Sequence, residues 1–150
     1  MASEAAPIWG DLAASAFVES SPLFKSLDPE AHDDLLRVAE QLVYPAGEVV
    51  VKQGEAGDEL FLVRDGTAVV LVESGGERRE MAYLDRGAIF GELAALGTPA
   101  RMAAVEARTD LTVVRVPGPV VVALAARFPR VAKLLAALRT ARAKGPEPAP

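Results

Sequence analysis

Apolar and polar residues follow three different spacings along this chain, and each spacing predicts a different kind of element. Up to about residue 42 the apolar positions recur with a helical period. The pair Asp28-Pro29 suits the start of a helix, and Tyr44-Pro45 suits an end. The apolar stripe between them consists of Leu35, Leu36, Val38, Ala39 and Leu42. We therefore predict helices over about residues 8–42.

Between about residues 43 and 117 the helical period gives way to short β-branched runs separated by turn residues. The runs are residues 49–52, 60–63, 68–72, 81–84, 102–107 and 111–116. Short strands spaced by roughly ten residues, with Gly-rich connections, predict a mainly-β fold: an antiparallel jelly-roll sandwich, or double-stranded β-helix. Asp65-Gly66 has the residue types of a type I′ hairpin turn between two of these strands.

The last part of the chain returns to a helical period and predicts C-terminal helices over about residues 118–143. Pro129 closes a first short segment. After it, Val131, Leu134, Leu135 and Leu138 fall at positions i, i+3, i+4 and i+7 of one amphipathic stripe. The final residues, 145–150, have the composition of a disordered tail. We predict one domain over residues 1–144.

Composition excludes several classes of protein. The 16 Lys and Arg residues against 21 Asp and Glu residues give a net charge of −5, the wrong sign for a protein that grips nucleic acid through its phosphates. No apolar run reaches the length of about 18 residues that a membrane span needs, and the N-terminus does not resemble a secretion signal. A chain with no cysteine and His32 as its one histidine lacks the ligands of the usual zinc and multi-histidine metal sites. Together with the absence of nucleophile-elbow and P-loop motifs, this predicts a cytoplasmic protein without catalytic residues, metal, membrane or DNA.

One stretch, FGELAALGTPARMAAV at residues 90–105, places two charges in an apolar run. Its first half is long enough for a short helix between two strands, and a helix N-terminus offers unpaired N–H groups to an anion. Gly91 would let a ligand approach the backbone, and Arg101 could bind a phosphate through two parallel bonds. Glu92 would instead accept from a neutral donor such as a sugar hydroxyl. The chemistry suits a ribose phosphate, and it equally suits a buried Glu–Arg pair that tethers a loop.

The same stretch resembles the phosphate-binding cassette of the cyclic nucleotide-binding domain family. That cassette runs Gly-Glu-Leu, a short helix, and then Arg followed by small residues. The nine-residue interval from Glu92 to Arg101 is similar to that of the regulatory subunits of cAMP-dependent protein kinase, and the bacterial catabolite activator has one residue more. Residues 44–70 and 84–92 resemble the strands that precede the cassette in the family. The resemblance covers roughly residues 20–140, in family order.

The resemblance implies a role for each matching residue. Glu92 would accept from the ribose 2′-OH, and Arg101 would pair with the exocyclic phosphate oxygens. Backbone amides around Gly91, Leu93 and Ala94 would complete the phosphate contacts. A helix near the C-terminus covers the purine in this family, and here the 131–138 stripe would take that place, or would pack against a second copy in a homodimer.

Met102 departs from the family pattern, in which Ala, Ser or Thr often follows the arginine. A Thr there is associated with guanine, so a side chain without a hydroxyl favours cAMP over cGMP. Met is also bulkier than Ala, and we expect it to narrow the binding site and weaken the binding of any ligand.

Two hypotheses of different kinds follow. In the first, the chain is a cyclic nucleotide sensor whose C-terminal helices move and signal to an effector protein. In the second, it is a ligand-independent interaction or scaffold subunit that keeps the fold. Retention of both Glu92 and Arg101 favours the sensor. Met102, and the absence of a helix-turn-helix, kinase, channel or cyclase segment, favour the scaffold.

Overall fold

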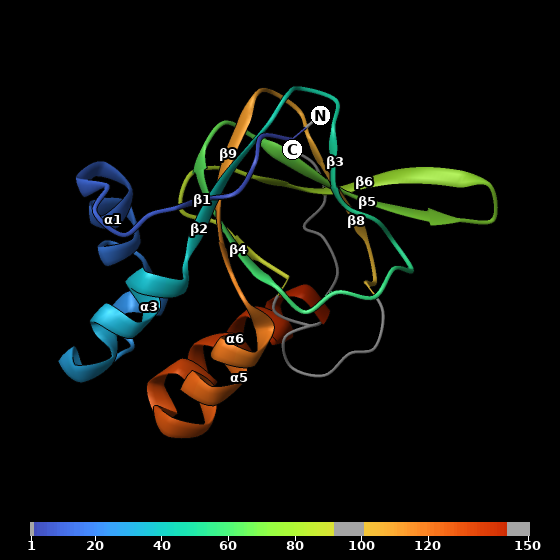
Figure 1. Cartoon of the computed structure of the whole chain (residues 1–150). Coiled ribbons are helices and arrows are strands. Elements are labelled where there is room, and N and C mark those ends of the chain that lie inside the picture. The colour runs from blue at the N-terminus through green and yellow to red at the C-terminus, as the bar shows by residue number, and fades with distance from the viewer. Residues whose placement is uncertain (1, 92–100, 144–150) are drawn as a thin grey trace.

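Two antiparallel sheets face each other at the centre of the computed structural model, which describes residues 2–91 and 101–143 (Figure 1). The five-stranded sheet has the order β1 (Ala6–Pro7), β2 (Glu40–Tyr44), β9 (Leu111–Val116), β4 (Leu60–Asp65) and β7 (Ile89–Phe90). The four-stranded sheet has the order β3 (Val49–Val51), β8 (Ala104–Ala107), β5 (Ala68–Ser74) and β6 (Glu77–Leu84). The predicted mainly-β jelly roll is confirmed.

The five-stranded sheet is covered on both faces, which explains the uninterrupted apolar runs of its central strands. In β4, Leu60 and Leu62 point to one side, where they join the helices in one core. Phe61 and Val63 point to the other side and join the four-stranded sheet in a second core. All four side chains are at most 2% exposed. A strand buried on both faces has no polar side to alternate with, so it reads as a continuous hydrophobic run.

Helices cover the outer face of the five-stranded sheet from both ends of the chain (Figure 1). They are α1 (Leu12–Glu19), α2 (Pro22–Lys25), the 3₁₀ turn η1 (Pro29–Ala31), α3 (His32–Val38), α5 (Gly118–Arg127) and α6 (Pro129–Ala143). Arg127, at the end of α5, forms an ion pair with Glu30 of η1, and Arg130, at the start of α6, forms one with Asp28, the residue before η1. No described helix has the length and apolar character needed to cross a bilayer.

The helix expected to continue to Leu42 is wrong at its C-terminal end. The helix α3 ends at Val38, and residues 40–44 form β2, which pairs with β9. Leu42 and Tyr44 are buried while Val43 is 41% exposed, which is the two-residue period of a strand. The predicted helical stripe had joined the apolar residues of a helix to the first inward residue of a strand.

The hairpin expected at Asp65-Gly66 is also wrong. The strands β4 and β5 belong to different sheets, and of these two residues only Gly66 has a positive φ, +86°. A Cβ on Gly66 would lie 2.1 Å from the carbonyl oxygen of Asp110, so the glycine allows two connections to cross closely. The two-residue hairpin turn is Gly75-Gly76, with φ of +61° and +82°, between β5 and β6.

The division into a domain of residues 1–144 and a tail of residues 145–150 stays a prediction, because residues 144–150 lie outside those that the structure describes.

Candidate functional site

Arg101 is buried just before β8, with 7% of its surface exposed. Its backbone is fixed on both sides by the connection after β3. The Gly54 N–H donates to the Arg101 carbonyl at 2.8 Å, and the Arg101 N–H donates to the Glu55 carbonyl at 2.9 Å. Ser21 and Arg101 are the buried polar residues of the described part of the chain. Because a buried guanidinium is costly unless acceptors surround it, such a residue points to a site.

The described contacts of the guanidinium include two backbone carbonyls. Nη1 donates to the Gly91 oxygen at 3.4 Å, and Nη2 donates to the Glu59 oxygen at 3.3 Å. Its Cζ atom lies 5.9 Å from the centre of the Phe61 ring. Both hydrogen bonds are longer than the usual 2.9–3.0 Å of an N–H···O bond. An anion offering short, bidentate bonds could therefore draw the guanidinium from these carbonyls.

Two glycines leave room for this arginine. A Cβ on Gly57 would lie 2.9 Å from both Nε and Nη2 of Arg101. A Cβ on Gly91 would lie 2.4 Å from the Glu59 oxygen and 3.0 Å from Nη1 of Arg101. Gly91 also has a φ of +91°, which other residues rarely adopt. The position of the guanidinium thus depends on the absence of two side chains.

The structure brings Gly91 and Arg101 together, as the sequence predicts. Met102 is 64% exposed, so its side chain extends toward solvent. The predicted ligand residues Glu92, Leu93 and Ala94 lie outside the described residues, and their roles stay predictions.

Sequence reasoning missed Gly57 and Glu59, which contact Arg101 from the connection between β3 and β4. The signal that could have found them is a second glycine three residues after Gly54. A loop that repeats glycine at this spacing is a candidate for close approach to another segment.

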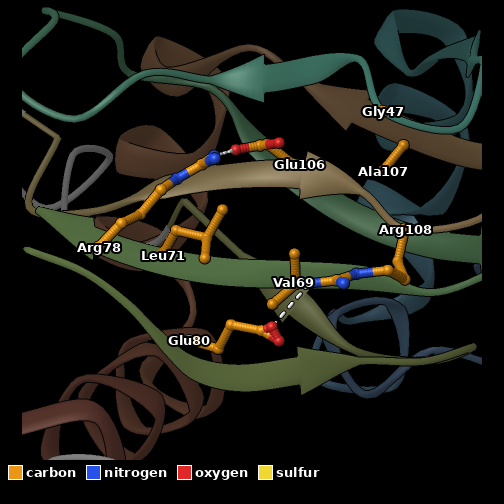
Figure 2. A pocket seen from close by; sticks show the side chains of 8 residues that line it. All are labelled: Gly47, Val69, Leu71, Arg78, Glu80, Glu106, Ala107 and Arg108. Atoms are coloured by element: carbon orange, nitrogen blue, oxygen red, sulfur yellow. Dashed lines mark hydrogen bonds and ion pairs between the residues drawn. The ribbon is translucent and has the colours of Figure 1, made fainter.

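A separate hollow of about 340 Å³ lies on the outer face of the four-stranded sheet (Figure 2). Its residues are Gly47, Val69, Leu71, Arg78, Glu80, Glu106, Ala107 and Arg108. Two ion pairs cross over β5, which lies between β6 and β8. Arg78 of β6 pairs with Glu106 of β8, and Glu80 of β6 pairs at 2.8 Å with Arg108, the residue after β8. Each arginine of this hollow has a carboxylate partner, so the four charges cancel and the hollow is poorly suited to binding an anion.

The hydrogen bond that the Tyr83 hydroxyl donates at 2.8 Å, together with Arg108, holds the pKa of Glu80 below its ordinary value, although Glu80 is exposed. Glu80 therefore stays ionised near neutral pH and keeps its pair with Arg108. Within residues 2–91 and 101–143 no three His, Asp or Glu side chains gather as a metal site would require.

Comparison with known proteins agrees with the fold. The cyclic nucleotide-binding domain model matches residues 41–128. The cyclic AMP receptor protein of Thermus thermophilus is 35% identical over 126 residues, which are 83% of this chain and 58% of that protein. A cAMP-dependent protein kinase regulatory subunit of Blastocladiella emersonii is 34% identical over 97 residues, 64% of this chain and 24% of that protein.

Among solved structures, the catabolite activator protein of Thermus thermophilus superposes with a TM-score of 0.71 at 35% identity, covering 83% of this chain and 59% of that one. The chain therefore spans about a quarter to three fifths of the length of these relatives. Since the family model covers more than half of its residues, the chain belongs to the cyclic nucleotide-binding domain family.

Proposed function

We propose that this chain binds a cyclic nucleotide, cAMP in preference to cGMP, and signals to a partner protein through its C-terminal helices. The observation that carries the proposal is the buried guanidinium of Arg101, held beside Gly91 by long bonds to backbone carbonyls. A phosphate offers a guanidinium shorter, charge-assisted bonds than these two carbonyls do.

In this proposal Arg101 pairs with the exocyclic phosphate oxygens, and the backbone from Gly91 to Ala94 donates to the same phosphate. Glu92 accepts from the ribose 2′-OH. The positive φ of Gly91, and the Glu59 carbonyl oxygen that would lie 2.4 Å from a Cβ there, place the Gly91 backbone directly against the loop that also accepts from Arg101.

The exposure of Met102 bears on affinity and on the choice of base. A side chain that is 64% exposed extends into solvent, so its bulk need not narrow the phosphate site. It has no hydroxyl with which to select guanine. The missing hydroxyl supports cAMP over cGMP.

The relatives support a regulatory role, since their names describe a cAMP receptor and a regulatory subunit of a kinase. For this chain the partner would be a protein that contacts α5 and α6. These helices share one hydrophobic core with the N-terminal helices and the five-stranded sheet, and two exposed ion pairs also join them to residues 28 and 30. A ligand that binds one arrangement of this packing better than another would shift the helices toward that arrangement.

Calorimetric titration with cAMP and cGMP tests the proposal. Arg101→Ala should weaken cAMP binding by about 1.5–3 kcal/mol, the worth of a hydrogen bond to a charged group. Arg101→Lys should restore little, because lysine keeps the charge and loses the planar fork. Arg108→Ala is the matched control, since this arginine lies on the outer face and pairs with Glu80. If the wild-type chain gives no heat with millimolar cAMP, the sensor proposal fails and the ligand-independent scaffold takes its place.

A further inference from the structure

The side chain of Gln53 takes the place of a strand at the edge of the four-stranded sheet. The strand β3 ends at Val51, and the pairing of β8 with β5 ends at Leu71 and Ala104. Two residues after Leu71 on β5, where β8 no longer pairs with it, the Glu73 N–H donates to Oε1 of Gln53 at 2.7 Å. Nε2 of Gln53 donates in turn to the Glu73 carbonyl at 3.1 Å. One amide side chain thus satisfies both backbone groups of Glu73, as a neighbouring strand would.

The segment that follows Gln53 surrounds Arg101. Gly54 and Glu55 exchange backbone hydrogen bonds with Arg101, at 2.8 and 2.9 Å. Gly57 lies against the guanidinium, and the Glu59 carbonyl accepts from it at 3.3 Å. The connection therefore holds both the backbone and the charged end of this arginine.

The two sets of contacts lie on one short piece of chain. The residue before Gly54 is anchored to β5, a strand with no described hydrogen bond to Arg101, while Gly54 itself bonds Arg101. Without the Gln53 anchor, the loop would be free to shift away from the sheet edge, and its backbone bonds to Arg101 would shift with it. Both hydrogen bonds of the Gln53 side chain are solvent-exposed, so they contribute little to the overall free energy of folding.

We infer that Gln53 is a positioning residue for Arg101: it fixes the 54–59 segment against Glu73, and this segment sets the place of the guanidinium. The inference rests on the proposed function for its consequence, which is tight binding of the phosphate. It also implies reciprocal coupling, so that a ligand on Arg101 steadies the outer half of the β5–β6 hairpin, which extends away from the rest of the sheet (Figure 1).

The first test needs no ligand. Amide hydrogen exchange measured by NMR on the free protein should be at least about tenfold faster at Gly54 and Arg101 in Gln53→Ala than in the wild type. The control is Gln41→Ala, which removes a glutamine of the opposite sheet whose side-chain oxygen accepts a hydrogen bond from Arg64. It should leave the exchange at both amides unchanged. Equal exchange in Gln53→Ala and wild type would overturn the inference.

The second test uses cAMP as the probe. Gln53→Ala should raise the dissociation constant about five- to twentyfold with little change in melting temperature, whereas Gln41→Ala should leave it within twofold. Gln53→Glu keeps the acceptor for the Glu73 N–H and loses the donor, so it should fall between, and it serves as the second variant if alanine impairs folding. If the melting temperature of Gln53→Ala falls while its dissociation constant for cAMP does not change, Gln53 has a structural role only and the inference is overturned. Failure of the wild type to bind cAMP would refute the proposed function, and the exchange data would still decide the role of Gln53.

Discussion

Replacing Gly57 with alanine should weaken ligand binding without weakening the fold. The new Cβ would lie 2.9 Å from Nε and Nη2 of Arg101, and ordinary contact begins at 3.4 Å, so the guanidinium must retreat by the difference of 0.5 Å. The flexible end of a side chain can make this movement. Gly57 does not use a positive φ, so alanine is compatible with its backbone and should stabilise the fold by about 0.4–1 kcal/mol through the unfolded chain.

The same 0.5 Å displaces the guanidinium from its 3.3 Å hydrogen bond with the Glu59 carbonyl and from its place for a ligand. Loss of one charge-assisted hydrogen bond costs about 1.5 kcal/mol at the lower end, which is roughly tenfold in the dissociation constant. Urea unfolding of the free protein and calorimetric titration with cAMP measure the two quantities separately.

Two further glycines make the comparison decisive. Gly91→Ala, with a φ of +91° and a Cβ 2.4 Å from a backbone oxygen, should lose about 1–3 kcal/mol of stability as well as affinity. Gly47→Ala, with a φ of +90° and open space around it, should lose about 1–2 kcal/mol of stability and no affinity. The reasoning is refuted if Gly57→Ala binds cAMP like the wild type, or if it unfolds as readily as Gly91→Ala.

Three other predictions concern parts of the fold away from the arginine. Burial raises the pKa of the Tyr44 phenol above 10.0, so its contribution to stability is present below pH 10 and is lost as the pH rises through the raised value. Tyr44→Phe should therefore flatten the fall of melting temperature above pH 10. Gly118→Ala places a Cβ 2.3 Å from the Asp58 carbonyl oxygen and should cost about 1–3 kcal/mol in urea unfolding, as overpacking does. Asp28→Asn removes the exposed pair with Arg130 and should cost at most about 1 kcal/mol, a difference that should disappear in about 1 M salt.

The strands β3 to β6, β8 and β9 were predictable because their apolar runs are bounded by turn residues. The runs at 60–63 and 111–116 predicted β4 and β9, although they did not show that both faces of these strands are buried. The failure at Leu42 has a physical cause: an apolar residue one turn beyond a helical stripe also fits the inward position of a strand that follows at once. Sequence spacing cannot separate these two cases until the partner strand, β9, is known.

The turn chemistry failed for a related reason. Asp65-Gly66 and Gly75-Gly76 both have residues that suit positive φ, yet only the second joins strands of one sheet. Gly66 is required by its approach to Asp110, a residue far along the chain. A local signal for glycine shows that something needs the space, and the fold determines what.

The candidate site, too, was only partly predictable from the sequence. Gly91 and Arg101 were identifiable because a single stretch of sequence contains both. Three other residues could not be identified in this way: Gly57, Glu59 and Gln53. The first two contact Arg101, about forty residues further along the chain, and Gln53 contacts Glu73, twenty residues further along. Such contacts depend on the register of strands in two sheets, which no local pattern encodes.

The contrast between Arg101 and Arg108 explains why residue type alone could not locate the site. Arg108 lies in the open on the outer sheet face, where Glu80 neutralises it and holds its guanidinium in an ion pair. Arg101 is buried, and its described acceptors at 3.3 and 3.4 Å are carbonyls that an anion can replace with a gain in bond strength. Seven positions separate the two arginines, and their surroundings differ because one precedes β8 at a crossing of loops and the other follows it at the surface. Which arginine is the candidate for an anion therefore depends on where the fold buries the charge, which residue type alone does not show.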